Sequence, residues 1–167
     1  MIVDEGKKVL NWNDLQAAGF TALMIHESQL KTNAKSHKGA WGLGQWIGAR
    51  RTNAKKFIGS NVNDFSKHVA FAIKEINENI IPLKKHYSTS DVGNDIRRAV
   101  ELCQGFFAFQ AGYPTHQIGQ SIQGYNGDWD VLHKNTENTV ATAHYLLGVP
   151  YPATQGWPGY GSKYLNS

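Results

Sequence analysis

Two motifs decide the fold of this chain, Ile25-His26-Glu27-Ser28 and Gly42-Leu43-Gly44-Gln45-Trp46. The first motif ends an apolar run that follows Asn13-Asp14 and has the spacing of one helix face. The second motif places a glutamine between glycine and tryptophan, which is typical of a tight turn. Residues 31–45 show no apolar periodicity and predict a long loop. The sequence therefore predicts one carboxylate, that of Glu27, at the end of a helix and beside a loop with glycine and tryptophan residues.

The remaining apolar residues predict a mainly α fold of five to seven helices, because they recur at helical spacing and no short alternating runs separate them. The clearest pattern follows Asn63-Asp64, a typical helix cap, and stops before Pro82. A turn is expected over residues 124–130. The expected helices run from Asn13 to about Leu30, from near Gln45 through Lys56, from Asp64 to about Ile80, from Ser90 or Asn94 to Gly112, over residues 115–124, and from about Thr136 to Leu147.

The length of 167 residues fits one domain with a buried core. We expect residues 1–149 to form this helical domain. Residues 150–167 differ in composition, because prolines and glycines alternate there with tyrosines and a tryptophan. We expect this irregular tail to pack its aromatic side chains on the helical domain. A sugar-binding edge and a linker are the alternatives.

The net charge of +4 and the isoelectric point near 9.1 favour anionic partners such as nucleic acid, anionic lipid or the polymers of a cell wall. Paired lysines and arginines would suit nucleic acid, but no signature of a nucleic-acid-binding fold accompanies them, so we expect no nucleic-acid partner. No segment approaches the roughly 20 apolar residues needed for insertion into a membrane. The N-terminus lacks the apolar core of a secretion signal.

The cysteine and the histidines give little indication of a catalytic thiol, a disulfide or a metal site. The single Cys103 excludes an internal disulfide and fits a small buried hydrophobe. His26 precedes Glu27, but Leu30 occupies the position where the zinc-binding pattern His-Glu-X-X-His needs its second histidine. The other histidines are scattered over different predicted elements. We therefore expect no metal ion and no cofactor.

Glu27 suits the cleavage of a glycosidic bond, which needs a protonated acid next to the leaving oxygen. An apolar environment keeps a carboxyl group protonated near neutral pH. Leu23 and Met24 lie about one turn before Glu27 and are expected to form the floor of its pocket. The alternative is a solvated glutamate on an amphipathic helix, and the motif that follows favours the acid.

The motifs, in this order, resemble those of the lysozyme-like lytic transglycosylases, which cut bacterial peptidoglycan. Glu27-Ser28, the loop of residues 33–45 and Tyr125-Asn126 match the family's Glu-Ser pair, its Asn-Ala-X-Ser-X-X-Gly-Ala-X-Gly-Leu-X-Gln loop and its Tyr-Asn pair. Residues 45–51 also resemble the corresponding turn of phage tail-associated lysozymes, which belong to the same broad superfamily.

The resemblance implies a lysozyme-like helical domain in which Glu27 acts as general acid and then as general base, without an essential second carboxylate. The product would be 1,6-anhydro-N-acetylmuramic acid, and Tyr125 would hold Glu27 in place. The implied substrate-binding residues are Ser28, Trp41, Gln45, Trp46, Tyr125 and Asn126. From the residues alone, the aromatic side chains could equally belong to the core, and Gln45 and Asn126 could equally shape turns.

Two departures from the family pattern bear on the mechanism. Gly44 stands where the family usually has methionine, so we expect a wider subsite. Asp128 follows the Tyr-Asn pair closely, and at about 6.5–9.5 Å across from Glu27 it could act as the base of an inverting hydrolase. We expect a lytic transglycosylase, with an inverting muramidase and a non-catalytic cell-wall-binding module as the alternatives.

The expected partner is the glycan strand of peptidoglycan. A wall-degrading enzyme without a secretion signal or disulfides suggests a bacteriophage product. We expect it to be carried in the virion, together with other virion proteins, or to be delivered to the bacterial periplasm and cell wall.

Overall fold

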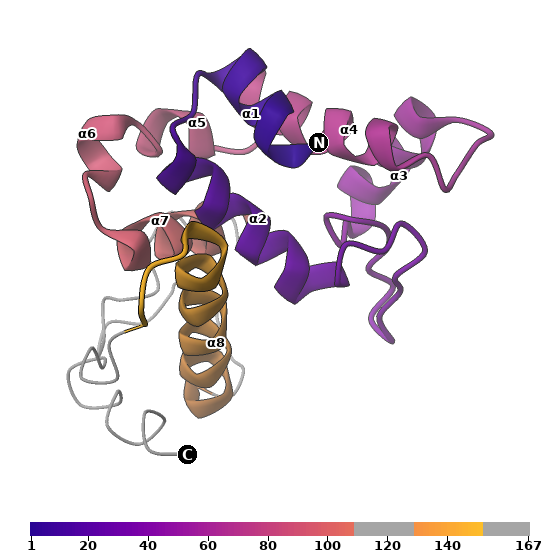
Figure 1. Ribbon diagram of the computed structural model, residues 1–167. Helices are drawn as coiled ribbons and strands as arrows, with labels where there is room; N and C mark the ends of the chain where they lie inside the picture. The colour runs from indigo at the N-terminus through magenta and orange to yellow at the C-terminus, as the bar shows by residue number, and fades with distance from the viewer. Residues whose placement is uncertain (109–128, 152–167) are drawn as a thin grey trace.

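The computed structural model describes residues 1–108 and 129–151, with the backbone alone for residues 129–133. These residues are mainly helical, as the sequence predicted, and contain isolated β-bridges but no strand. They form eight α-helices and one π-helix, where five to seven helices were expected. The helices are α1 (Ile2–Leu10), α2 (Asp14–Ser28), α3 (Gly48–Ile58), α4 (Phe65–Asn77), α5 (Leu83–His86), α6 (Thr89–Val92), α7 (Ile96–Cys103), the π-helix η1 (Gln104–Ala108) and α8 (Trp129–Leu147) (Figure 1).

Helix α2 packs against α1, α7 and α8 and lies at the centre of the described part of the chain (Figure 1). It begins with a capping box, in which the Asn13 side chain accepts a hydrogen bond from the Gln16 N–H (2.9 Å) and the Gln16 side chain accepts one from the Asn13 N–H (2.8 Å). This arrangement confirms the predicted start of the helix. The helix ends at Ser28, slightly before the predicted end, because Gln29 adopts a left-handed conformation with a φ of 53°.

A glycine in the middle of α2 permits the close approach of α7. A Cβ atom at Gly19 would lie 2.8 Å from the hydroxyl oxygen of Tyr87 and 2.9 Å from the Cβ atom of Ala99. The Tyr87 hydroxyl donates a hydrogen bond of 2.6 Å to the backbone carbonyl of Gln16. Packing between helices therefore accounts for a residue that weakens an isolated helix.

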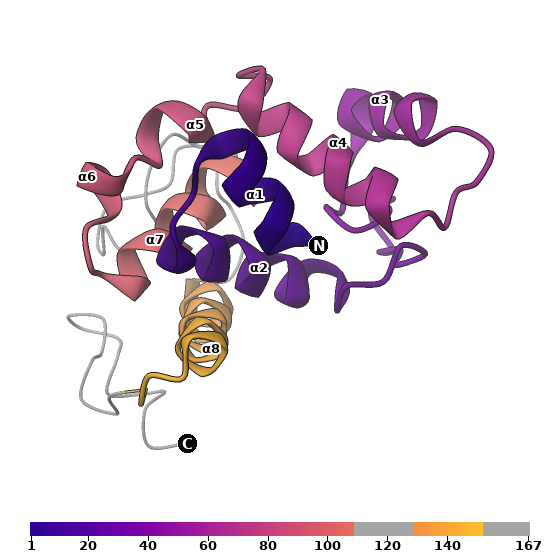
Figure 2. The same ribbon diagram turned by 45° about the horizontal axis from the view of Figure 1, so that its top comes forward.

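Two groups of buried apolar side chains hold the helices together. The larger group includes Phe20 of α2 and Phe107 of η1, whose rings meet edge to face with centres 5.1 Å apart. The smaller group joins α2, α7 and α8 through Ala22, Val100 and Val140. Figures 1 and 2 both place α3 and the loop before it beyond the C-terminal end of α2, away from α6.

Two parts of the N-terminal half differ from the prediction. Helix α1 was not predicted, and only Ile2 and Gly6 are buried within it. Helix α4 ends at Asn77, before the predicted end at about Ile80. The chain turns there because Ile81 is completely buried, whereas Ile80 is half exposed.

Of the two starts expected for the next helix, the one near Asn94 agrees with α7, whereas the one near Ser90 falls in the separate short helix α6. Gly93 ends α6 with a φ of 58°, a conformation that glycine adopts at little cost. The side chain of Asp95 then caps α7 by accepting a hydrogen bond from the Arg98 N–H. Within α7, Cys103 is buried, as expected.

The last helix begins earlier than predicted, at Trp129 instead of about Thr136, so the final residues of the turn expected over 124–130 are helical. The helix predicted over 115–124 lies outside the described residues, and so does the tail beyond residue 151. No helix in the described part of the chain is long and apolar enough to span a bilayer.

Candidate active site

The loop between α2 and α3 is folded around Gln45, which adopts a left-handed conformation with a φ of 48°. The side-chain amide of Gln45 donates hydrogen bonds to the carbonyl oxygens of Ala34 (3.1 Å) and Gly42 (2.9 Å). Backbone hydrogen bonds of 3.0 and 2.9 Å join Trp41 and Trp46 in both directions. The amide nitrogen of Gln45 therefore holds the loop together, as in the turn-forming alternative. A contact between Gln45 and substrate stays a prediction.

The two tryptophans of this loop lie in the core. Trp46 is completely buried, Trp41 is 6% exposed, and the centres of their rings lie 5.7 and 5.0 Å from that of buried His68. Nδ1 of His68 accepts a hydrogen bond from the Leu43 N–H (3.3 Å), so Nε2 carries the proton and donates to the Val62 carbonyl (2.7 Å). Burial lowers the pKa of His68, which fits this neutral form. The positions of both tryptophans match the core alternative, and their stacking on a sugar stays a prediction.

Packing against Trp46 explains the glycine at position 44. A Cβ atom at Gly44 would lie 2.6 Å from the Cε2 atom of Trp46, well inside ordinary contact distance. The indole of Trp46 therefore fills the space that a longer side chain would need. This gives Gly44 a structural role, and the wider subsite expected from the sequence stays a prediction.

Glu27 lies in the last turn of α2 with a partly buried side chain, next to the buried residues Leu23 and Met24. Burial raises the pKa of Glu27 to about 7, although the positive charge of Arg50 acts in the opposite direction. A large share of the carboxyl groups is therefore protonated at neutral pH, which is the state that a proton donor requires. The neighbouring Ser28 is buried, and its hydroxyl donates a hydrogen bond of 3.0 Å to the Met24 carbonyl.

Arg50 takes part in an ion pair that the sequence did not predict. Its Nε and Nη2 atoms donate to the two carboxylate oxygens of Glu75 at 2.8 and 2.9 Å, and its Nη1 atom donates to the Phe107 carbonyl at 3.1 Å. The indole nitrogen of Trp46 donates to the same carboxylate at 2.7 Å. Glu75 is completely buried, and three hydrogen bonds compensate its charge.

This ion pair fixes the cation that acts on Glu27. The centre of the Arg50 guanidinium lies 4.9 Å above the Phe107 ring, so hydrogen bonds and ring contact together hold it in place. The sequence contained one signal for this arrangement, because Glu75 lies on the apolar face of its helix three residues after Ala72. That position predicts that the carboxylate is buried and needs a partner, but it does not identify Arg50 as the partner.

Three residues of the expected site, Tyr125, Asn126 and Asp128, lie outside the described residues, and their roles stay predictions. The described residues contain no group of three histidine, cysteine, aspartate or glutamate side chains that could hold a metal ion. The structure thus describes the Glu27 side of the expected site, with the Gln45 loop and the Arg50–Glu75 pair.

The chain matches the family model described as phage tail lysozyme over residues 3–146, which include every helix from α2 to α7. Neither the comparison with curated proteins nor the comparison with solved structures finds a match.

Proposed function

The chain belongs to the phage tail lysozyme family, and we propose that it cleaves the β-1,4 bond between N-acetylmuramic acid and N-acetylglucosamine with Glu27 as the proton donor. The family supports a lysozyme-like enzyme that degrades peptidoglycan. The observation that carries the choice of residue is the partly buried carboxyl group of Glu27, whose pKa is raised to about 7. We also infer that the protein is associated with a phage virion, where other virion proteins would be its neighbours.

Glu27 would act twice in the proposed reaction. Its protonated carboxyl group would first donate a proton to the glycosidic oxygen as the bond to N-acetylmuramic acid breaks. The resulting carboxylate would then accept the proton of the C6 hydroxyl of the same sugar, which attacks C1 and closes a 1,6-anhydro ring. A pKa near neutrality suits both steps, because the group must lose and regain a proton at the same pH. This sequence makes the protein a lytic transglycosylase.

A hydrolytic muramidase is the second candidate. In that enzyme Asp128 would act as a base and activate a water molecule on the opposite face of the sugar. The match of the motifs to the lytic transglycosylases, which lack an essential second carboxylate, supports the mechanism with one carboxylate. The presence of Asp128 in place of the small residue of the family pattern supports the alternative.

The test compares the wild type, Glu27→Gln and Glu78→Gln in the clearing of purified sacculi. Glu78 is an exposed glutamate at the end of α4 and serves as the matched control. We expect the wild type and the control to clear sacculi and Glu27→Gln to be inactive. Equal clearing by all three would refute the role of Glu27.

Mass spectrometry of the released fragments separates the remaining alternatives. Anhydro ends support the transglycosylase, whereas reducing ends together with the loss of activity in Asp128→Asn support the muramidase. If neither the wild type nor any variant clears sacculi and all of them still bind the wall, the protein is a non-catalytic wall-binding module.

A further inference from the structure

The excess positive charge of the chain is confined to one segment, residues 28–63. This segment contains seven of the seventeen lysine and arginine residues and none of the thirteen aspartate and glutamate residues. The remainder of the chain carries ten cationic and thirteen acidic side chains. The net charge of +4 is therefore a property of the loop and helix that follow Glu27, and not of the whole surface.

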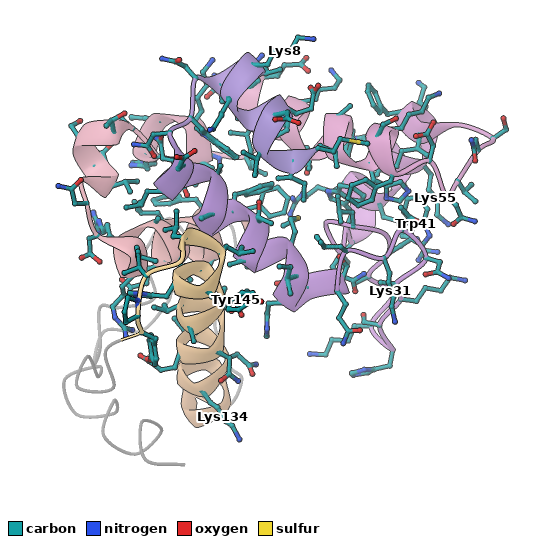
Figure 3. All side chains as sticks on the ribbon, in the orientation of Figure 1. Lys8, Lys31, Trp41, Lys55, Lys134 and Tyr145 are labelled. Atoms are coloured by element: carbon teal, nitrogen blue, oxygen red, sulfur yellow. The ribbon has the colours of Figure 1, made fainter. Side chains whose placement is uncertain are left out.

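Three exposed lysines of the loop after α2, Lys31, Lys35 and Lys38, are called the loop lysines here. None of the ion pairs formed by the described residues involves a loop lysine. Figure 3 shows Lys31 on the same side of the molecule as Trp41 and Lys55. The loop lysines are thus exposed on one loop, without a carboxylate partner in the described part of the chain.

Other cations of the segment have structural contacts. Arg50 binds buried Glu75, and the Nη1 atom of Arg51 donates a hydrogen bond of 3.1 Å to the carbonyl of Gly39. The Nζ atom of Lys55 lies 5.2 Å above the ring of Trp41. Arg51 and Lys55 therefore brace the loop, while the loop lysines extend from it.

Hydrogen bonds fix the position of the loop relative to Gln45. The N–H of Gly42 and the side-chain amide of Gln45 both donate to the carbonyl of Ala34, at 2.9 and 3.1 Å. Ser36 closes a smaller turn, because its N–H donates to the Ala40 carbonyl at 3.1 Å and its hydroxyl accepts from the Ala40 N–H at 3.1 Å. The backbone next to the loop lysines is therefore joined by hydrogen bonds to the turn that follows Glu27 in the sequence.

We propose that the loop lysines bind the carboxylates of the peptide stems on the glycan strand that is being cut. This inference rests on the proposed function, which brings an N-acetylmuramic acid residue to Glu27. The peptide stem is attached to that sugar, so stem carboxylates lie close to the bond being cut. Lysine suits such a ligand because its ammonium group is a mobile point charge that does not require one fixed orientation of the carboxylate. The loop lysines would thus favour strands that carry stems over bare glycan.

The experiment measures binding in a Glu27→Gln background, so that the strands stay intact during the measurement. The loop variant is Lys31→Gln/Lys35→Gln/Lys38→Gln. The control variant is Lys8→Gln/Lys85→Gln/Lys134→Gln, which removes the same charge from exposed lysines outside the segment. Each protein is titrated with glycan strands freed of phosphodiester polymers, either with their stems or after an amidase has removed the stems and the lactyl carboxylates left on the sugars have been converted to methylamides. Duplex DNA is a third ligand.

We expect the loop variant to bind stem-bearing strands about tenfold more weakly than the parent, as three exposed ion pairs allow, and the control to stay within about twofold. On stemless strands we expect the two variants to bind alike. Equal weakening of both variants on stem-bearing strands would overturn the proposal. The proposal would also be overturned if the loop variant lost the same factor of affinity on stem-bearing and on stemless strands. A third contrary result would be that the loop lysines are needed for binding DNA and that DNA binds more tightly than the strands.

Cleavage by the protein with Glu27 intact is measured on the same stem-bearing strands. If binding depends on the loop lysines as described but no cleavage occurs, the proposed function fails, and only the binding of stem carboxylates by the loop lysines stands. If cleavage occurs and the loop variant binds as tightly as the parent, the inference alone fails.

Discussion

Arg50 and Glu75 bind each other through two hydrogen bonds, of 2.8 and 2.9 Å, although they belong to different helices. Glu75 is completely buried, and the side chain of Arg50 is 15% exposed. The cation that acts on Glu27 is thus opposed by a carboxylate within hydrogen-bonding distance. We infer that this pairing limits how far Arg50 lowers the pKa of Glu27, and that the pair helps to keep the proton donor protonated.

Replacing Glu75 by glutamine tests this inference. Glu75→Gln leaves the Arg50 charge uncompensated, so the pKa of Glu27 should fall and the alkaline limb of the activity profile should move to lower pH. Removing one partner of a buried pair also destabilises the fold by about 3 kcal/mol. The measurement is the rate of sacculus clearing as a function of pH, at temperatures where circular dichroism shows the variant to be folded. The control is Glu78→Gln. An unchanged profile in folded Glu75→Gln would contradict the inference.

The activity of the wild type should decrease as the pH rises through about 7. The reason is that the carboxyl group of Glu27 has its pKa raised to about 7 by burial, and only the protonated form can donate to the glycosidic oxygen. Initial rates on soluble glycan strands between pH 5 and pH 9, at constant ionic strength, provide the measurement. A rate that stays constant up to pH 9 would show that Glu27 is not the essential acid.

The stability of the protein should also depend on the ionisation of Glu27. The pKa of Glu27 is higher in the folded chain, about 7, than the ordinary value of 4.5, so the folded state binds more protons in this interval. The free energy of unfolding therefore falls as the pH rises from about 4.5 to about 7, by on the order of 3 kcal/mol from this group. Glu27→Gln removes the ionising group.

We accordingly expect Glu27→Gln to unfold at a higher temperature than the wild type at pH 8 and at nearly the same temperature at pH 4. Thermal unfolding followed by circular dichroism at both pH values measures this difference. Glu78→Gln should show no such pH-dependent gain. A variant that is less stable than the wild type at pH 8 would mean that the Glu27 carboxylate is not held in a desolvated position.

Local signals in the sequence predicted much of the fold. The pairs Asn13-Asp14 and Asn63-Asp64 were identified as helix starts because they precede apolar helical runs, and one residue of each pair, Asn13 and Asp64, caps the helix. Pro82 indicated a break, and α5 begins directly after it. Gly93 lies between the two helix starts that the sequence left open, Ser90 and Asn94; it ends α6, and α7 begins after it, close to the Asn94 start.

Contacts between distant residues account for what the sequence did not predict at the candidate site. The spacing of the motifs identified Glu27 and Gln45, whose positions follow from one helix end and one turn. The partner of Glu75 could not be identified, because Arg50 is 25 residues away and on another helix. The packing role of Gly44 could not be predicted for a similar reason, since the residue that fills the space beside it is visible only once Trp46 has been placed.

Replacing Gly44 tests this last interpretation. A Cβ atom at this position would lie 2.6 Å from Trp46, whose indole is also hydrogen-bonded to Glu75. Gly44→Ala must displace the indole or the loop, and we expect a loss of stability of about 1–3 kcal/mol. Gly39→Ala is the comparison, because Gly39 has a φ of 86° and its nearest neighbouring atom, from Arg51, would be 3.5 Å away.

The free energy of unfolding of Gly39→Ala should therefore fall only by the cost of placing alanine in a left-handed conformation, about 1–2 kcal/mol. The surroundings of Trp46 should not change. Urea unfolding gives both free energies, and tryptophan fluorescence reports whether the indoles have moved. We expect the emission of the folded protein to change in Gly44→Ala and to stay constant in Gly39→Ala. If Gly44→Ala keeps both the stability and the emission of the wild type, the contact with Trp46 does not explain the glycine, and a wider subsite becomes the better explanation.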